Sequence, residues 1–321
     1  MATKIKFKRS SSGSVNRNVQ DRLEEQISVK DFGAVADGDT TATDNTSAFQ
    51  AAINAALATG VSTIKIPAGT YFFTRASSPL DVGVGGLTFV GDSKTKSILY
   101  FDEGVDLSLK HLFSNVVNTV KKNLKFLDIG FKGSFPTRAL GVPLGSVFNL
   151  SYYSDITVKD CEFNNLGWSV GNFSYLGKFS FIDNTVSTLG GNGIVLNDTP
   201  NYEISNNYFY RPGGVTITSL LLAANLGTQL EEKSFITKNI CLSTGGILVY
   251  GPKNLKISYN ILKLPNQFGI SVGYNSTTND GKCALNDVDI SNNTITDVVN
   301  ITSITPAIPL AYISVTGVPP T

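Results

Sequence analysis

The sequence is poor in the residues that metal sites, disulfide frameworks and histidine-based catalysis require. It has one histidine, one methionine, one tryptophan and three cysteines in 321 residues. The cysteines, Cys161, Cys241 and Cys283, lack a metal-like spacing, and their odd number argues against a disulfide framework. We therefore expect no metal and no cofactor. Cys161 and Cys241 lie in alternating apolar segments, and we expect them in the core.

Charge is also scarce, and the chain lacks a long apolar run. Charged residues make up 16% of the sequence, and the formal net charge is +1. Such a balance gives no electrostatic footprint for nucleic acid or for an anionic membrane. No run approaches ~18 apolar residues, and the basic start MATKIKFKRSSSG is not followed by the apolar stretch of a secretory signal. We therefore expect no nucleic-acid partner, no membrane insertion and synthesis without a signal peptide.

What the sequence does have is a repeat with the pattern apolar-x-apolar-x-x-Asn-x-apolar. It occurs in FSFIDNTV, YEISNNYF, SFITKNIC, LKISYNIL and VDISNNTI, with weaker copies in LKFLDIGF and ITVKDCEF. The recurring position falls at Ile129, Cys161, Asn184, Asn207, Asn239, Asn260 and Asn293. The intervals are 32, 23, 23, 32, 21 and 33 residues. Strand-like repeats of this period predict a β-solenoid, of about nine coils, with insertions of about ten residues after Ile129, Asn207 and Asn260.

The repeated asparagines have a structural interpretation. Stacked coils lie ~4.8 Å apart, so that an asparagine at the same place in each coil can hydrogen-bond to the next as a ladder. Asparagine also tolerates the left-handed backbone conformation that a bend between strands requires. We therefore expect these side chains to stabilise the coil rather than to act on a ligand.

One helix precedes the repeat. In DNTSAFQAAINAALATG, Phe49, Ile53 and Leu57 share one helical face and Gly60 is a stop signal. We expect a helix from about Asn45 to Leu57, followed by strands. Because the first coil of a solenoid leaves an open core and an unpaired edge, this helix is predicted to cap it.

These residues carry a family resemblance. VKDFGAVADGDTTATDNTSAFQAAINAA, followed by IPAGTY, resembles the opening segment of the pectate-lyase-like (pectin lyase fold) right-handed parallel β-helix, in the version found in bacteriophage tailspikes. The matching positions are Asp31, Phe32, Gly33, Ala34, Asp37, Gly38, Asp44, Thr46, Ala48, Gln50, Ile53, Pro67, Gly69 and Tyr71. The resemblance extends to about Asp297. It implies an all-β, single-stranded parallel β-helix with an N-terminal capping α-helix.

The segments on either side complete a four-part division. KIKFKRSSSG is similar to leader segments of phage tail fibre proteins, although a disordered basic tag is the alternative. Val19, Leu23 and Ile27 have helical spacing that suits a trimeric neck, although packing on its own domain would give the same pattern. We expect a leader and neck helix over 1–28, a β-helix opening segment over 29–80, coils over 81–299 and a short tip over 300–321.

The resemblance implies a homotrimeric tailspike in the virion, attached through its N-terminus to a phage tail or baseplate protein. Such a protein recognises a host surface polysaccharide, a capsule or lipopolysaccharide O-chain, and depolymerises it. Two alternatives stay open: a spike of the same fold that only adheres or has a structural role, and a non-viral polysaccharide lyase or hydrolase. The leader, the neck and the lack of a signal peptide disfavour the last.

Candidate catalytic residues come from the alignment of the repeats. Glycoside hydrolysis uses two carboxyls about 5–9.5 Å apart, and adjacent coils supply spacings of ~4.8 Å and its multiples. The candidates are Asp128, Asp160, Asp183 and, two residues after the second of them, Glu162. The same column continues as Asn206 and Asn292, so that a turn position favouring Asx residues is the alternative.

Aromatic side chains are the candidates for carbohydrate binding, because a ring can pack against the C–H face of a sugar. They are Trp168, Tyr175, Tyr208 and Tyr210, with Tyr152 and Tyr153 as further platforms. Burial under loops or against a neighbouring subunit is the alternative. Arg211 could pair with a uronate, and His111 could act as the base of a lyase or be a structural residue. The calcium-binding aspartate cluster of pectate lyases is not recognisable, so no metal is predicted. We expect an endoglycosidase rather than a polysaccharide lyase.

Overall fold

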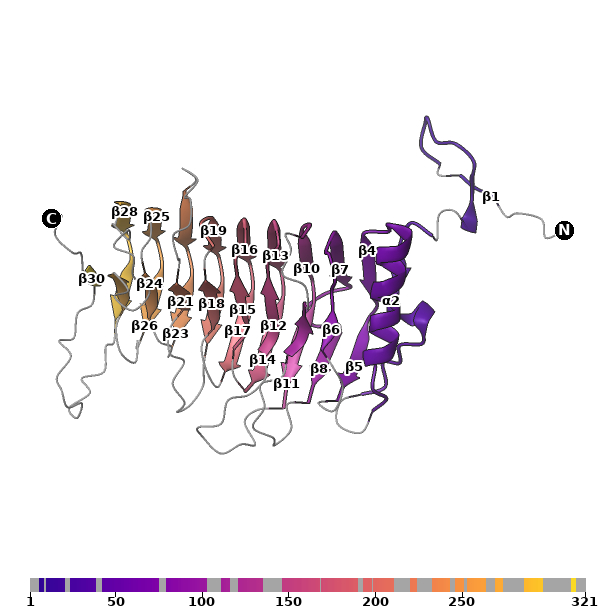
Figure 1. The fold of residues 1–321 in the computed structure, drawn as a ribbon, viewed down its shortest axis with the longest axis horizontal. Helices are drawn as coiled ribbons and strands as arrows, with labels where there is room; N and C mark the ends of the chain where they lie inside the picture. The colour runs from indigo at the N-terminus through magenta and orange to yellow at the C-terminus, as the bar shows by residue number, and fades with distance from the viewer. Residues whose placement is uncertain are drawn as a thin grey trace.

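The protein is a three-sided coil of parallel strands (Figure 1). The computed structural model describes residues 6–8, 10–20, 24–38, 42–74, 79–102, 111–115, 121–134, 146–167, 169–189, 193–197, 199–210, 220–223, 233–242, 246–250, 253–263, 269–273, 286–296 and 313–315. Two of the three long sheets have nine strands and the third has ten. The predicted parallel β-helix and its count of about nine coils are therefore confirmed. The predicted insertions lie mostly outside the described residues.

We name the sheets I, II and III in the order in which the chain visits them in each coil. Sheet I contains β3 (Ile27–Ser28), β4 (Thr63–Ile66), β7 (Leu87–Gly91), β10 (Leu124–Leu127), β13 (Asp155–Lys159), β16 (Lys178–Ile182), β19 (Tyr202–Ser205), β22 (Ser234–Thr237), β25 (Lys253–Ser258) and β28 (Asn286–Ser291). Alternation along these strands points one set of side chains into the core and the other outward.

Sheets II and III close the coil. Sheet II contains β5 (Gly69–Phe73), β8 (Ser97–Phe101), β11 (Gly130–Gly133), β14 (Glu162–Leu166), β17 (Thr185–Leu189), β20 (Tyr208–Tyr210), β23 (Ile240–Leu242), β26 (Ile261–Lys263) and β29 (Thr294–Thr296). Sheet III contains β6 (Leu80–Asp81), β9 (His111–Ser114), β12 (Ser146–Ser151), β15 (Gly171–Ser174), β18 (Ile194–Asn197), β21 (Leu220–Ala223), β24 (Ile247–Tyr250), β27 (Ile270–Gly273) and β30 (Ile313–Val315). Because β30 pairs with β27, this part of the expected C-terminal tip continues the coil.

The coil core consists of side chains stacked in register from one coil to the next. Phe89 stacks on Phe126 with ring centroids 5.0 Å apart, and Phe131 stacks on Phe163 at 4.9 Å. Cys161 and Cys241 are buried, as expected, whereas Cys283 lies outside the described residues. No single coil could bury these groups by itself, so each coil depends on its neighbours for stability.

The predicted asparagine ladder is present between sheets I and II. The Nδ2 of each ladder asparagine donates to the Oδ1 of the next, from Asn184 through Asn207, Asn239 and Asn260 to Asn293, over 2.9–3.1 Å. The left-handed bend lies one residue earlier than expected. It falls on Asp128, Asp160, Asp183, Asn206, Lys238, Tyr259 and Asn292, each with a positive φ. The ladder asparagines are thus selected for their hydrogen bonds and the preceding residues for the bend.

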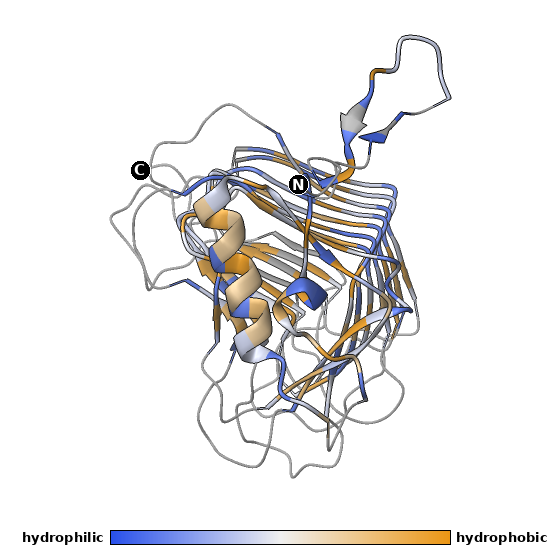
Figure 2. Ribbon diagram, turned by 90° about the vertical axis from the view of Figure 1, so that its right-hand side faces the viewer, coloured by the Kyte–Doolittle hydropathy of each residue, from blue (hydrophilic) through white to orange (hydrophobic). Residues whose placement is uncertain are grey.

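Helix α2 (Thr46–Thr59) lies across the N-terminal end of the coil, as Figure 2 shows from that end. Phe49, Ala52, Ile53 and Ala56 are buried in the core cluster, and Gly60 ends the helix in the left-handed conformation. Burying this apolar stripe against the first coil explains why a 14-residue α-helix forms in a strand-rich chain.

The segment before the helix differs from the expected neck. Val19 and Gln20 are helical, and Leu23 lies outside the described residues. Ile27 was expected on the neck helix, but it begins β3, is buried and pairs in parallel with Ile64 of β4. Its helical spacing from Val19 was therefore misleading, because burial in the coil outweighs a three-residue pattern. Upstream, β1 (Lys6–Phe7) and β2 (Arg17–Asn18) form an antiparallel hairpin that projects from the coil (Figure 1).

Candidate functional site

The outer face of sheet II carries two columns of side chains that run along the coil. Strand register places Ile98, Gly130, Glu162, Thr185 and Tyr208 in the first column. Two residues further along each strand, the second column contains Tyr100, Lys132, Asn164, Ser187 and Tyr210. Neighbours within a column are ~4.8 Å apart, so the two columns form a continuous surface several coils long.

A groove of about 210 Å³ lies on this surface around Glu162. Its lining residues are Lys94, Thr95, Ile98, Gly130, Phe131, Lys132, Glu162 and Asn164. Gly130 is required because a Cβ at that position would stand 2.4 Å from the carbonyl oxygen of Lys94. The loop that carries Lys94 therefore packs directly onto the strand beside Glu162.

Two lysines line the groove together with Glu162. Lys94 reaches across the groove, and its Nζ donates to the hydroxyl of Thr185 over 3.2 Å. The Nζ of Lys132 lies 5.2 Å from the centre of the Tyr100 ring. The backbone N–H of Glu162 donates to the carbonyl oxygen of Ile129 over 3.0 Å, but its side-chain carboxylate has no hydrogen-bond or ion-pair partner among the described residues. The groove thus presents one unpaired carboxylate, the Asn164 amide and two ammonium groups, a set that can hydrogen-bond to hydroxyl groups and exchange a proton.

Aromatic side chains continue the same surface two coils further on. Tyr208 and Tyr210 stack with ring centroids 6.2 Å apart, and Tyr208 is exposed. Both lie on the outer face of β20, in the columns of Glu162 and Asn164. Two of the tyrosines that the sequence suggested for carbohydrate binding therefore share a face with one of the suggested carboxylates.

The three predicted aspartates lie elsewhere, at the corner between sheets I and II. Asp128, Asp160 and Asp183 form one column, because the backbone N–H of each bonds to the residue before the bend in the next coil. The Nζ of Lys159 stands 3.7 Å from a carboxylate oxygen of both Asp160 and Asp183. None of the three lines the groove around Glu162. The structure therefore brings Asp160 and Asp183 together around one lysine and places Glu162 on the neighbouring face.

Tyr175 lies at a different corner, between sheets III and I. It stacks on Tyr152 with centroids 4.7 Å apart, and 51% of its surface is exposed. Tyr153 is buried, and its hydroxyl donates to the carbonyl oxygen of Gly83 over 3.1 Å. Tyr153 is therefore a core residue rather than a binding platform. Trp168 and Arg211 lie outside the described residues.

His111 begins β9 in sheet III, away from Glu162. Burial lowers the pKa of its imidazole, so the neutral form prevails at pH 7. No group of three or more His, Cys, Asp or Glu in the described ranges could hold a metal ion. No helix in the same ranges is long and apolar enough to cross a membrane.

Sequence reasoning missed three groove residues, Lys94, Lys132 and Asn164. Lys132 and Asn164 each lie two positions after a residue of the first column, Gly130 and Glu162. Because side chains alternate along a strand, the sequence could have predicted that they face the same side as Glu162. Lys94 has no comparable signal. It enters through a loop that precedes β8, and only the folded coil brings it to Thr185.

Comparison with known proteins gives a family and a fold. A family model described as rhamnogalacturonase A/epimerase, pectate lyase-like, matches residues 26–266. Mannuronan C5-epimerase AlgE5 of Azotobacter vinelandii is 32% identical over 112 residues, which are 33% of this chain and 11% of that protein. The chain therefore matches only about a tenth of the length of this curated relative.

The solved structures with a similar fold include tailspike proteins. A variant of the tailspike protein of E. coli bacteriophage HK620, in complex with a hexasaccharide, has a TM-score of 0.65 and 16% identity, covering 98% of this chain and 60% of that chain. A second variant, in complex with a pentasaccharide, has a TM-score of 0.64 and 15% identity, covering 96% and 56%. At this identity the likeness establishes the parallel β-helix fold.

Proposed function

Since the chain belongs to the rhamnogalacturonase A/epimerase, pectate lyase-like family, we propose that it binds a polysaccharide along the outer face of sheet II and cleaves its glycosidic bonds. The single observation that carries this proposal is the unpaired Glu162 carboxylate in a groove on the same outer face of sheet II that carries Tyr208 and Tyr210 two coils further on. The relatives agree with a saccharide ligand, since two tailspike structures contain oligosaccharides and the epimerase is named for a polysaccharide.

The groove chemistry suits glycan recognition. Lysine, asparagine and serine side chains offer hydrogen bonds to hydroxyl groups without a large net charge, and the tyrosine rings offer flat surfaces for sugar C–H groups. Glu162 is the proposed general acid–base, because it alone among the four predicted catalytic residues lines the groove. Asp160 and Asp183 are the proposed second carboxyls, one coil apart at the adjacent corner, and Asp128 extends their column.

The test is product release from a host surface polysaccharide, either capsule or lipopolysaccharide O-chain. Glu162→Gln should lower the release of reducing ends by about 10²–10⁴-fold, the usual contribution of a general acid–base. Glu203→Gln is the matched control, because Glu203 projects from sheet I and its carboxylate accepts the Ser205 hydroxyl over 2.9 Å. Absorbance near 235 nm in the products would indicate elimination instead of hydrolysis. Equal activity of the two variants would remove Glu162 from the mechanism.

A second candidate function is adhesion without cleavage. The bend column favours it, because Asn206, Lys238, Tyr259 and Asn292 adopt the same left-handed conformation as the three aspartates. The aspartates then need no role beyond the bend. Under this alternative, the protein binds the host polysaccharide, the tyrosine variants Tyr208→Ala and Tyr210→Ala weaken binding, and no new reducing ends appear.

We also propose that the protein acts as a homotrimeric phage tailspike in the virion, joined to a tail or baseplate protein through its N-terminal segment. The hairpin of β1 and β2, which projects from the coil, is the proposed attachment point. Light scattering should give three times the mass of 34.3 kDa. A monomer that still binds polysaccharide would refute the trimer and leave the binding proposal in place.

A further inference from the structure

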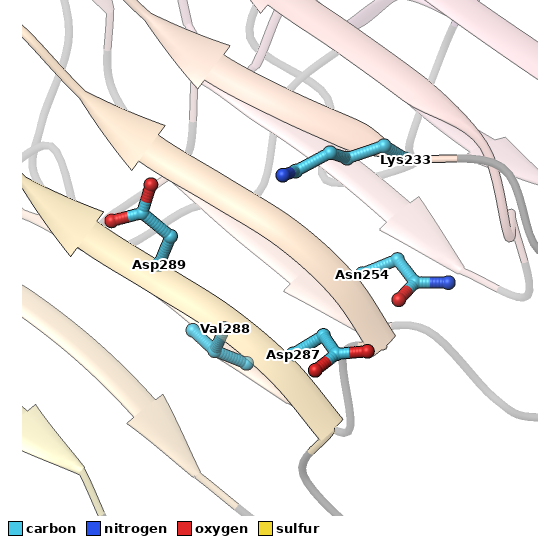
Figure 3. A pocket seen from close by; sticks show the side chains of 5 residues that line it. All are labelled: Lys233, Asn254, Asp287, Val288 and Asp289. Carbon is cyan, nitrogen blue, oxygen red and sulfur yellow. The ribbon is translucent and has the colours of Figure 1, made fainter.

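Sheet I carries a second cavity near the C-terminal end of the coil. It measures about 490 Å³, and Lys233, Asn254, Asp287, Val288 and Asp289 line it (Figure 3). None of these residues belongs to the groove around Glu162. The cavity lies on a different sheet, and its volume is within the usual range for small-ligand sites.

Strand register explains how the polar groups come together. The pairing of β22 with β25 and of β25 with β28 places Lys233, Asn254 and Asp287 in one column on three successive coils. At ~4.8 Å per coil, the backbones of Lys233 and Asp287 are about 10 Å apart with Asn254 between them. Asn254 and Asp287 both have positive φ, 48° and 49°. Both asparagine and aspartate tolerate this conformation. The backbone therefore accounts for an Asx residue at each position but does not require the negative charge of Asp287.

The charges in the cavity are only partly neutralised. The Nζ of Lys256 pairs with a carboxylate oxygen of Asp289 over 3.2 Å, and the Ser291 hydroxyl also bonds to Asp289. By contrast, the Lys233 ammonium and the Asp287 carboxylate form no hydrogen bond or ion pair within the described ranges, although the charge of Lys233 lies near enough to Asp289 to help hold the pKa of that carboxyl below its usual value. In Figure 3 the Lys233 side chain extends across the cavity, and the carboxylates of Asp287 and Asp289 point away from each other.

This arrangement does not suit a second catalytic pair. Glycoside cleavage needs two carboxyls that converge on one bond, whereas these diverge and one of them is committed to Lys256. It does suit binding. An unpaired ammonium favours an anionic group, while an unpaired carboxylate about two coils away accepts hydrogen bonds from hydroxyl groups. A ligand that carries one anionic group and several hydroxyls satisfies both ends.

We propose that this cavity is an accessory site for an acidic saccharide residue, with its anionic substituent on Lys233 and its hydroxyls on Asp287 and Asn254. The proposal rests on the proposed function, because it assumes that the protein acts on a polysaccharide. It adds a chemical class for the ligand and a second place of attachment. Lys233 lies about three turns of the β-helix beyond Glu162. A long polysaccharide that is bound at Lys233 would therefore stay attached to the protein after cleavage at the groove.

The experiment measures binding of three labelled hexasaccharides to the full chain: hexagalacturonate, a sulfated galactan hexasaccharide and neutral maltohexaose. We expect the wild type to bind at least one anionic probe at least tenfold more tightly than the neutral one. Lys233→Gln should weaken that binding at least tenfold, and Lys233→Arg should restore it to within about threefold because the charge is kept. The carboxylate and sulfate probes distinguish the two sources of the anionic group.

Lys178→Gln is the matched control. Lys178 is an exposed lysine of the same sheet column, two coils before Lys233, and it does not line the cavity. Equal losses in Lys178→Gln and Lys233→Gln would mean non-specific charge attraction and would overturn the proposal. Unchanged affinity in Lys233→Gln, or no binding of either anionic probe by the wild type, would overturn it as well.

Cleavage separates this failure from failure of the proposed function. If Lys233→Gln keeps its affinity while Glu162→Gln loses product release, only the accessory site is wrong. If the wild type neither binds nor cleaves the host polysaccharide, the proposed function itself is wrong. A retained rate of product release in Lys233→Gln, together with weaker binding, is the expected combination.

Discussion

Replacing Asn207 by alanine tests whether the ladder holds the coil together. Asn207 lies in the middle of the ladder and is 1% exposed. Its Nδ2 donates to the carbonyl oxygen of Phe181 over 2.8 Å and to the Oδ1 of Asn239 over 2.9 Å. Its Oδ1 accepts from the backbone N–H and the side-chain Nδ2 of Asn184, at 2.9 and 3.1 Å. Asn207→Ala removes all four hydrogen bonds and keeps the Cβ.

The size of the effect follows from the groups left behind. The Phe181 carbonyl and two donors of Asn184 lose these partners in a buried place, whereas the Oδ1 of Asn239 still accepts from the backbone N–H of Asn207. A buried polar group without a partner costs ~1–3 kcal/mol. The Phe181 carbonyl keeps its place in the strand ladder with β19, so that two orphaned Asn184 donors remain, and with partial relaxation we expect a loss of about 2–5 kcal/mol. That is a large share of the ~5–15 kcal/mol that stabilises a typical protein.

The assay is urea unfolding followed by circular dichroism, with Asn54→Ala as the control. Asn54 lies on the exposed side of α2, where its side chain accepts a single hydrogen bond from Gln50. Asn54→Ala should therefore change the free energy of unfolding by no more than about 0.5 kcal/mol. A urea midpoint of Asn207→Ala that coincides with that of Asn54→Ala would refute the reasoning. The ladder would then be a consequence of the coil and not one of its main supports.

Three further predictions concern the core, the helix and pH. Cys161 occupies a ladder position, and its thiol donates to the Phe126 carbonyl oxygen over 3.5 Å. Cys161→Asn should therefore extend the ladder by one asparagine and keep or raise the urea midpoint. A fall in the free energy of unfolding of more than about 1 kcal/mol would contradict this. Phe49→Ala should lower the free energy of unfolding by about 3–5 kcal/mol. It should speed amide hydrogen exchange more in β4 and β5, which lie near the helix, than in β25; an equal increase in all three strands would count against a capping role. Hydrogen bonds from Ser291 and Lys256 hold the pKa of Asp289 below its usual value, so its contribution to stability is present above the unfolded-state pKa of ~4 and is lost as the pH falls through the lowered pKa. The melting temperatures of wild type and Asp289→Asn should therefore differ most at about pH 6 and approach each other as the pH falls below ~4, whereas a difference that stays constant into the acid range would contradict this.

The sequence predicted the coil because the coil depends on a repeated local requirement. Each buried ladder asparagine must bond to the next coil, and this requirement leaves the same residue at Asn184, Asn207 and Asn239. The bend was expected at the ladder asparagine but lies on the residue before it, in the column that was also interpreted as a turn position favouring Asx residues. Ile27 was assigned to a helix because Val19, Leu23 and Ile27 are spaced four residues apart, and a pattern of only three residues cannot show that the helix ends before the last of them.

The groove was predictable only in part. Glu162 and Tyr208 are outward-facing strand residues, and aligning the repeats places them on sheet II. Grouping Glu162 with Asp160 relied on nearness in sequence, but the bend at Asp160 separates the two faces. Lys94 and the cavity at Lys233 depend on loop paths and on strand pairing over many residues. A single sequence carries no local signal for such contacts.

The central claim is that saccharide lies on the outer face of sheet II. The most direct test is a structure of the Glu162→Gln protein with the oligosaccharides that the wild type releases from host polysaccharide. The account predicts ligand density in the groove beside residue 162, continuing over Tyr208 and Tyr210. Density confined to sheet III, or to the corner at Asp160 and Asp183 with an empty groove, would contradict it.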